Sequence, residues 1–215
     1  KDQQVHGFFK TLIISILVVV FYLILTSNFT FSEILRYSIF NVTSILTGTG
    51  FTSTNYNGWG TPIILLFLFI TFIGGCAGST TCGVKIFRLQ IVFNNSKEMI
   101  SKLISPNRVV NKRYNGEHLS PEVTQSVITF LFIFILTFIV LSVLLSFTGL
   151  DLLTSFSAAA TSISNVGPGL GQLIGPAYSF SQIPEIAKWL LSFGMLAGRL
   201  EFLTLIVIFN KSFWR

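Results

Sequence analysis

The stretch "ILRYSIFNVTSILTGTGFTS" (residues 34–53) joins a short, largely apolar segment to a neutral segment rich in glycine and hydroxyl groups. As an α-helix, residues 34–45 would extend roughly 18 Å, which is too short for a hydrocarbon core about 30 Å thick. We therefore expect this segment to enter the membrane and return on the same side. Such re-entrant backbone is tolerated only where it is buried in protein or lines a wet cavity.

The composition of the whole chain is that of an integral membrane protein. Of its 215 residues, 51% are hydrophobic and only 10% are charged, against about 25% charged in soluble domains. Residues 11–32, 37–84 and 123–150 carry no charge, and each run can hold the roughly 20 apolar residues of a membrane-spanning helix. The first run is too long for a signal peptide and lacks a cleavage site, so it is expected to remain. Because the sequence begins at Lys1, we also expect a fragment of a longer protein.

The distribution of charge predicts the orientation of the chain in the membrane. Lys and Arg number 14 against 8 acidic residues, and residues 95–120 are rich in Lys and Arg. By the positive-inside rule this loop is cytoplasmic, so the charge excess is a topology signal and no nucleic-acid partner is expected. The two cysteines and two histidines do not supply the four clustered ligands of a structural metal site.

The chain contains two copies of one unit. The first has an apolar helix at about residues 8–26, the short segment, a neutral turn and a second apolar helix from about Thr61. The second has an apolar helix at about residues 125–147, "LLTSFSAAATSI", "SNVGPGLGQ" and a helix from about Pro184.

The glycines of the two copies align. Gly50 aligns with Gly167, and, after one short insertion, Gly74 aligns with Gly194. An even number of crossings separates the copies, so the repeats are parallel. This division predicts a first membrane repeat at residues 1–95, a cytoplasmic linker at 96–120 and a second membrane repeat at 121–215.

The neutral segment after each short helix is predicted to coordinate a cation. Non-helical backbone in a membrane leaves carbonyl oxygens unpaired, and rings of such carbonyls replace the hydration shell of K⁺ in channel filters. Glycine permits the backbone dihedrals that this requires, and the helix directs its partly negative C-terminal end at the site. No carboxylate occurs in either segment. The predicted filter residues are Thr47, Gly48, Thr49, Gly50 and Phe51 in the first repeat and Ser164, Asn165, Val166, Gly167 and Pro168 in the second.

Two other interpretations of these segments compete with a filter. A phosphate-binding loop would follow a strand and end in G-K-[ST], which neither segment does. An ordinary surface loop has the same residue types. However, the neutral segment occurs twice, each time between a short and a long helix, and this recurrence favours a filter. Gly48 and Asn165 depart from the T-V-G-Y-G of potassium channels, which leaves a less selective K⁺/Na⁺ transporter as an alternative.

Four motifs together resemble one family. "TGTGF" (residues 47–51), "SNVGPGLG" (164–171), "GGCAGSTTCGVKIFR" (74–88) and "GRLE" (198–201) resemble the Trk/Ktr/HKT superfamily of potassium transporters, and in particular its TrkH-type pore-forming subunits. Members carry four such repeats in one polypeptide around a single pore, and this chain resembles the third and fourth. The resemblance implies a multi-pass protein of the cell inner (plasma) membrane, a homodimer with one pore per protomer, and a soluble nucleotide-binding regulatory subunit on the cytoplasmic face.

Residues 74–83 interrupt the second helix of the first repeat. Each glycine costs a helix up to about 1 kcal/mol relative to alanine, so a break is expected. The break could be a kink or a site of close helix packing, whereas the resemblance implies an intramembrane loop that lies under the filter and gates the pore. The residues that this assigns to the gate are Gly74, Gly75, Gly78, Ser79, Thr80, Thr81 and Gly83.

Arg199 is the remaining candidate gate residue. It is expected within an apolar helix, about midway between Pro184 and Trp214, and charges inside a membrane usually face a wet cavity or a partner. The resemblance implies that Arg199 lines the permeation path, and a buried ion pair is the alternative. Glu201 is two residues away and faces away from Arg199 on a helix, so we expect Glu201 to brace a neighbouring helix.

These observations predict an all-α integral membrane protein built from tandem helix–pore helix–filter loop–helix repeats. Its predicted function is potassium uptake through a channel-like pore, with K⁺ as the transported ion and no bound cofactor. An ion-coupled secondary transporter with re-entrant loops is the alternative, although such proteins often have inverted repeats. No nucleophile with a base and no paired carboxylates are found, so an enzyme is not expected.

Overall fold

The computed structural model describes residues 2–105 and 113–200. The chain forms, in order, α1 (Gln3–Thr26), α2 (Phe31–Leu46), η1 (Tyr56–Trp59), α3 (Thr61–Thr71), β1 (Ile73–Gly74), β2 (Val84–Lys85), α4 (Ile86–Ile104), β3 (Arg113–Tyr114), β4 (Glu117–His118), α5 (Pro121–Phe147), α6 (Leu152–Ser164), η2 (Phe180–Gln182) and α7 (Glu185–Arg199). The predicted all-α fold class is confirmed, because each strand in the described part has only 2 residues.

Two helices in the described ranges are long and apolar enough to cross a membrane. They are α1, with 24 residues, and α5, with 27. Asp2 caps α1 by accepting a hydrogen bond from the amide of Gln4 at 3.0 Å, and α5 begins with Pro121 at its first turn, where a missing N–H costs nothing. Both helices lie at the positions that the apolar runs predict.

The two short helices each follow a long one, as the repeat requires. Helix α2 has 16 residues and begins with a capping box between Thr30 and Glu33, which satisfies N–H groups at its first turn. Helix α6 has 13 residues and begins at Asp151, whose carboxylate accepts from the amide of Thr154. The central residues of α6 are small and almost fully buried, because α6 packs between α5 and α7.

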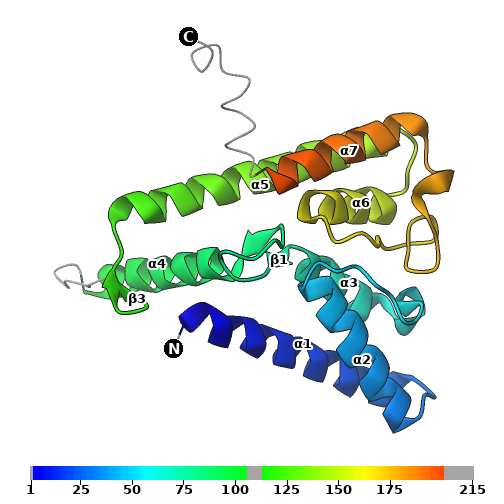
Figure 1. Cartoon of the computed structure of the whole chain (residues 1–215), viewed down its shortest axis with the longest axis horizontal. Coiled ribbons are helices and arrows are strands. Elements are labelled where there is room, and N and C mark those ends of the chain that lie inside the picture. Colours follow the sequence, from blue (N-terminus) through cyan, green and yellow to red (C-terminus); the bar gives the residue numbers. More distant parts are fainter. Residues whose placement is uncertain (1, 106–112, 201–215) are drawn as a thin grey trace.

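Each repeat has its own apolar core. In Figure 1, α1 and α2 lie at the bottom, α3 and α4 lie at middle height, and α5, α6 and α7 lie at the top; α4 packs against both α1 and α5. The core of the first repeat includes Phe67 and Tyr56, and the core of the second includes Leu145 and Ile163. Val166 of the second repeat is buried in the core of the first, so the loop after α6 joins the two halves.

Three features of the structure were not foreseen from the sequence. Helix α4 runs to Ile104, so the helix continues beyond residue 95 into the predicted linker, where Lys102 pairs with Glu98 one turn earlier at 2.6 Å. Helix α7 ends at Arg199, and Leu200 is its C-cap, so Arg199 is the last residue of this helix and does not lie midway along it. Gly74 and Gly194 align in sequence but differ in structure, because Gly74 lies in β1 and Gly194 in α7.

Candidate functional site

The two segments predicted to form a filter, residues 47–51 and 164–168 and named the filter segments for that prediction, have matching backbone conformations. Gly48 and Gly50 have φ angles of 71° and 75°, and Asn165 and Gly167 have 52° and 115°. Positive φ is favourable for glycine, and asparagine tolerates the left-handed region better than most other residues. The alternation of positive φ therefore recurs at equivalent positions in both repeats, although asparagine replaces the first glycine in the second.

Each filter segment is bound to the C-terminal end of its short helix through N–H groups. The amide of Thr49 donates to the carbonyl of Ser44 at 3.0 Å, and the amide of Val166 donates to the carbonyl of Thr161 at 3.1 Å. The amide of Gly167 donates to the Thr161 hydroxyl at 2.8 Å. Within the described part of the chain, the carbonyl oxygens of residues 47–51 and 165–168 accept no hydrogen bond. These carbonyls are free to coordinate a cation.

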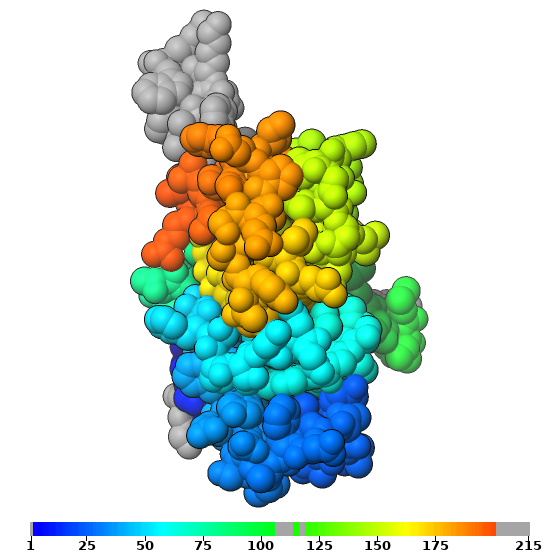
Figure 2. Space-filling model, turned by 90° about the vertical axis from the view of Figure 1, so that its right-hand side faces the viewer, coloured from blue at the N-terminus to red at the C-terminus, as the bar shows by residue number. Residues whose placement is uncertain are grey.

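The structure brings the two filter segments into contact. A Cβ on Gly50 would collide with the carbonyl oxygen of Val166 and would lie 3.1 Å from Cδ of Pro168, so only glycine fits there. A second junction forms where the side-chain amide of Asn57 donates to the carbonyl of Gly171 at 2.7 Å. Figure 2 shows this junction, where the cyan surface of the first repeat meets the yellow surface of the second. Phe51, by contrast, is 73% exposed.

The gating segment, residues 74–83, is a compact loop between α3 and α4. Strands β1 and β2 pair in parallel at its base, and the amide of Gly75 donates to the Thr81 hydroxyl at 2.9 Å. The Ser79 and Thr81 hydroxyls are 2.6 Å apart. Glycine is required at Gly74, where a Cβ would collide with the carbonyl oxygen of Cys82. The predicted break in the helix is thus a folded loop with its own hydrogen bonds.

The gating segment contacts both the first filter segment and Arg199. A Cβ on Gly48 would lie 3.9 Å from Cγ2 of Thr81. The guanidinium of Arg199 donates to the carbonyl of Thr80 at 2.6 Å, and Arg199 and the gating segment line a cavity of about 220 Å³. Arg199 is exposed and forms no ion pair with another described residue. Glu201 and its predicted bracing role lie outside the described residues.

Several contacts around these segments have no counterpart in the sequence predictions. The side-chain amide of Asn165 donates to the carbonyl of Met195 on α7 at 3.0 Å, and a Cβ on Gly198 would collide with the carbonyl oxygen of Ile163. Gly194 and Gly198 form a G-x-x-x-G pattern, which marks close helix packing in membranes. That pattern is the signal that could have predicted the tight packing of α6 on α7.

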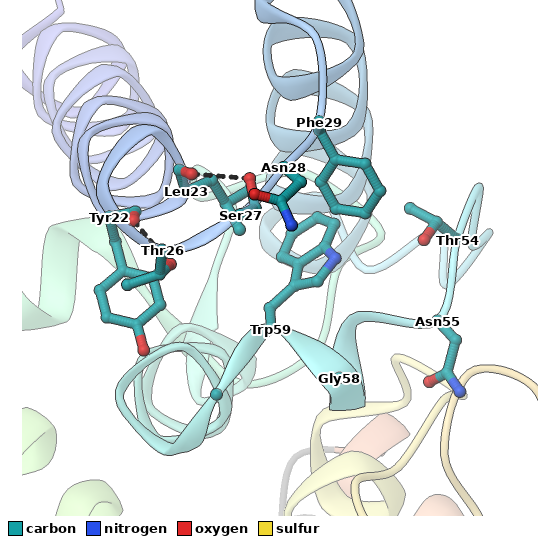
Figure 3. A pocket seen from close by; sticks show the side chains of 11 residues that line it. Tyr22, Leu23, Thr26, Ser27, Asn28, Phe29, Thr54, Asn55, Gly58 and Trp59 are labelled. Atoms are coloured by element: carbon teal, nitrogen blue, oxygen red, sulfur yellow. Dashed lines mark hydrogen bonds between the residues drawn. The ribbon is translucent and has the colours of Figure 1, made fainter.

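A second cavity, of about 620 Å³, lies apart from the filter and gating segments (Figure 3). It opens between the end of α1 and the loop around η1, and Tyr22, Phe29 and Trp59 contribute its aromatic walls. None of its lining residues is charged, and none belongs to the predicted site. We therefore assign the cavity no part in ion coordination.

Comparisons with a family model and with individual known proteins point to the same family. The TrkH family model, described as "Cation transport protein", matches residues 8–215. The chain is 42% identical over 215 residues to the Trk system potassium uptake protein TrkI of Halomonas elongata, covering 100% of this chain and 44% of that protein. It is 38% identical over 178 residues to the Trk system potassium uptake protein TrkH of Vibrio parahaemolyticus, covering 83% of this chain and 36% of that protein.

A solved structure is similar as well. The crystal structure of the potassium transporter TrkH from Vibrio parahaemolyticus superposes with a TM-score of 0.91 at 33% identity, covering 100% of this chain and 45% of that one. The chain therefore spans less than half the length of these similar proteins.

Proposed function

The chain belongs to the TrkH family of cation transport proteins, and we propose that it forms part of a pore through which K⁺ enters the cell. The observation that carries this proposal is the pair of contacting filter segments whose carbonyl oxygens accept no hydrogen bond from the described residues. Unpaired backbone carbonyls are costly in a membrane, and a dehydrated K⁺ ion supplies the missing partner. The similar proteins named above are potassium uptake proteins by name.

The absence of fixed charge in the filter segments supports K⁺ as the ion. Neither segment contains an acidic or basic side chain, so selection depends on neutral oxygens, as in potassium channels. Both short helices end at a filter segment, and their C-terminal dipoles favour a cation. No other group is needed for permeation, so we propose no bound cofactor.

We propose that the gating segment and Arg199 together control the flow of ions beneath the filter. The gating segment lies next to Gly48 and is bound by Arg199 through Thr80. Its backbone contains glycines with positive φ at Gly78 and Gly83, which suit a loop that changes conformation. A positive charge at this place limits the time that a cation spends there.

For the orientation, we propose that the filter segments face the outside of the inner membrane. The basic residues near 96–120 and the C-terminus then lie in the cytoplasm. The proposed assembly is a homodimer that binds a soluble nucleotide-binding regulatory subunit on its cytoplasmic face. The name "Trk system" carried by the similar proteins supports a multi-component assembly.

The filter assignment is tested with Gly50→Ser in the full-length protein reconstituted in liposomes. The added side chain meets the Val166 carbonyl and strains a residue with φ of 75°, so the K⁺/Na⁺ permeability ratio should fall about tenfold or more, equivalent to about 1.4 kcal/mol. Gly58→Ser is the matched control, because a Cβ there has open space and ordinary φ. Equal ratios in the two variants would remove the filter assignment. A wild-type ratio near one would instead support the less selective K⁺/Na⁺ transporter.

A further inference from the structure

The gating segment is held from two sides, and one of them is the start of α1. On the α7 side, Arg199 donates to the carbonyl of Thr80. On the α1 side, the amide of Ala77 donates to Oε1 of Gln4 at 2.7 Å. Gln4 lies in the first turn of α1, so the position of the gating segment depends on where that turn sits.

Gln4 is in turn connected to the β3–β4 hairpin. Its Nε2 donates to one carboxylate oxygen of Asp2 at 3.1 Å, and the side-chain amide of Asn115 donates to the other at 2.8 Å. The backbone amide of Gln3 also donates to Oδ1 of Asn115 at 2.9 Å. A continuous chain of hydrogen bonds therefore leads from Asn115 through Asp2 and Gln4 to Ala77.

Further hydrogen bonds connect the hairpin to the start of α1 and to α4. Asn115 and Gly116 both have positive φ, 52° and 89°, as in the tight type I′ turns that join two antiparallel strands. The Tyr114 hydroxyl donates to Oε1 of Gln90 on α4 at 2.8 Å. Nε2 of Gln90 then donates to the carbonyl of Gln3 at 3.0 Å. The turn, α4 and α1 are thus tied together.

We propose that Gln4 is a positioning residue for the gating segment, and that the β3–β4 hairpin sets the position of this segment through Asp2 and Gln4. The side chain of Gln4 suits this role because its oxygen accepts from Ala77 while its nitrogen donates to Asp2. These bonds lie at the exposed surface, where the net strength of a hydrogen bond is modest, so movement of the hairpin can break and remake them. The consequence for ion flux rests on the function proposed above for the gating segment.

The position of the gating segment can be followed through Cys76, a free and partly buried cysteine next to Ala77. In the full-length protein with Cys82→Ser, Gln4→Leu removes the acceptor for the Ala77 amide. The rate at which a water-soluble maleimide modifies Cys76 should rise on the order of fivefold, as expected for loss of one ordinary hydrogen bond. The flux of ⁸⁶Rb⁺ from liposomes is measured in parallel and should change with it.

Gln3→Leu is the matched control. It changes the same residue type one position earlier, and Gln3 contributes only its backbone to the network. Asn115→Gly tests the same connection from the hairpin side: it removes the bonds of the Asn115 side chain to Asp2 and to the Gln3 amide but changes no residue of α1 or the gating segment, and glycine keeps the positive φ of the turn. Asn115→Gly should also raise the Cys76 rate. The Cys76 modification rate of the double variant Gln4→Leu/Asn115→Gly should be only slightly higher than that of Gln4→Leu alone, because both substitutions break the same path.

The outcomes separate this inference from the function on which it rests. A Cys76 rate in Gln4→Leu equal to that in Gln3→Leu would overturn the positioning role. A double variant with fully additive effects would overturn the path through the hairpin. A raised Cys76 rate with unchanged ⁸⁶Rb⁺ flux would support the positioning role and remove the gate assignment instead.

Discussion

At the scale of single residues, the proposed pore makes Arg199 the group whose charge would most directly oppose the passage of a cation. A unit charge about 4 Å from K⁺ repels it by about 4 kcal/mol at an effective dielectric constant of about 20, and even ~1.4 kcal/mol is a tenfold change in rate. Arg199→Ala also removes the hydrogen bond to the Thr80 carbonyl. We therefore expect ⁸⁶Rb⁺ uptake to increase severalfold or more.

Two variants separate the charge of Arg199 from its packing. Arg199→Lys keeps the charge, so the ⁸⁶Rb⁺ uptake of this variant should stay close to that of wild type. Lys188→Ala removes another cation of the same helix, a half-buried one that donates to the carbonyl of Ser181, and should leave uptake unchanged. Because Arg199 is exposed, the yield of detergent-extracted Arg199→Ala should match wild type. A well-folded Arg199→Ala with unaltered uptake would contradict a role in permeation.

At the scale of an element, the capping box of α2 gives that helix a pH-dependent start. The Thr30 hydroxyl and backbone amide donate to the Glu33 carboxylate at 2.7 and 2.9 Å, and these bonds hold the pKa of Glu33 below its ordinary value of 4.5. Since the folded pKa is the lower one, the stabilisation is complete above pH 4.5 and is lost as the pH falls through the folded pKa.

The measurement compares melting temperatures of wild type and Glu33→Gln in detergent. Wild type should be the more stable at pH 7, and the difference should shrink as the pH is lowered below 4.5 and the folded carboxylate becomes protonated. Ser32→Ala lies in the same turn and carries no charge, so its effect should not depend on pH. A wild-type advantage that does not change with pH would show that the Glu33 carboxylate does not stabilise α2.

The elements that sequence reasoning predicted are those whose signals are local. The short helices follow from their length, and the filter turns from the glycines at Gly50 and Gly167. The end of α4 was missed because the helix leaves the apolar run and continues with polar residues. The contacts of the gating segment were also missed, because Gln4 and Arg199 are 73 and 119 positions from their partners Ala77 and Thr80. Nothing in a local pattern encodes such pairs.

At the scale of the whole molecule, the surface of the long helices leaves room for lipid and for further protein. Large apolar side chains are exposed along α1 and α5, including Phe21 at 67% and Phe147 at 84%. Native mass spectrometry of the full-length protein, extracted with lipid, should show a dimer that retains a soluble nucleotide-binding subunit. A monomer that carries no such subunit would contradict the proposed assembly.

The use of Asn165 where the first repeat has Gly48 has a consequence for how such a pore can evolve. A ring assembled from identical chains changes at every symmetry-related position when one codon changes. Here the equivalent positions are separate codons with different residues in the same backbone conformation. In the proposed filter, each carbonyl around the ion can therefore be adjusted alone, so the preference for one cation over another can drift in small increments under selection.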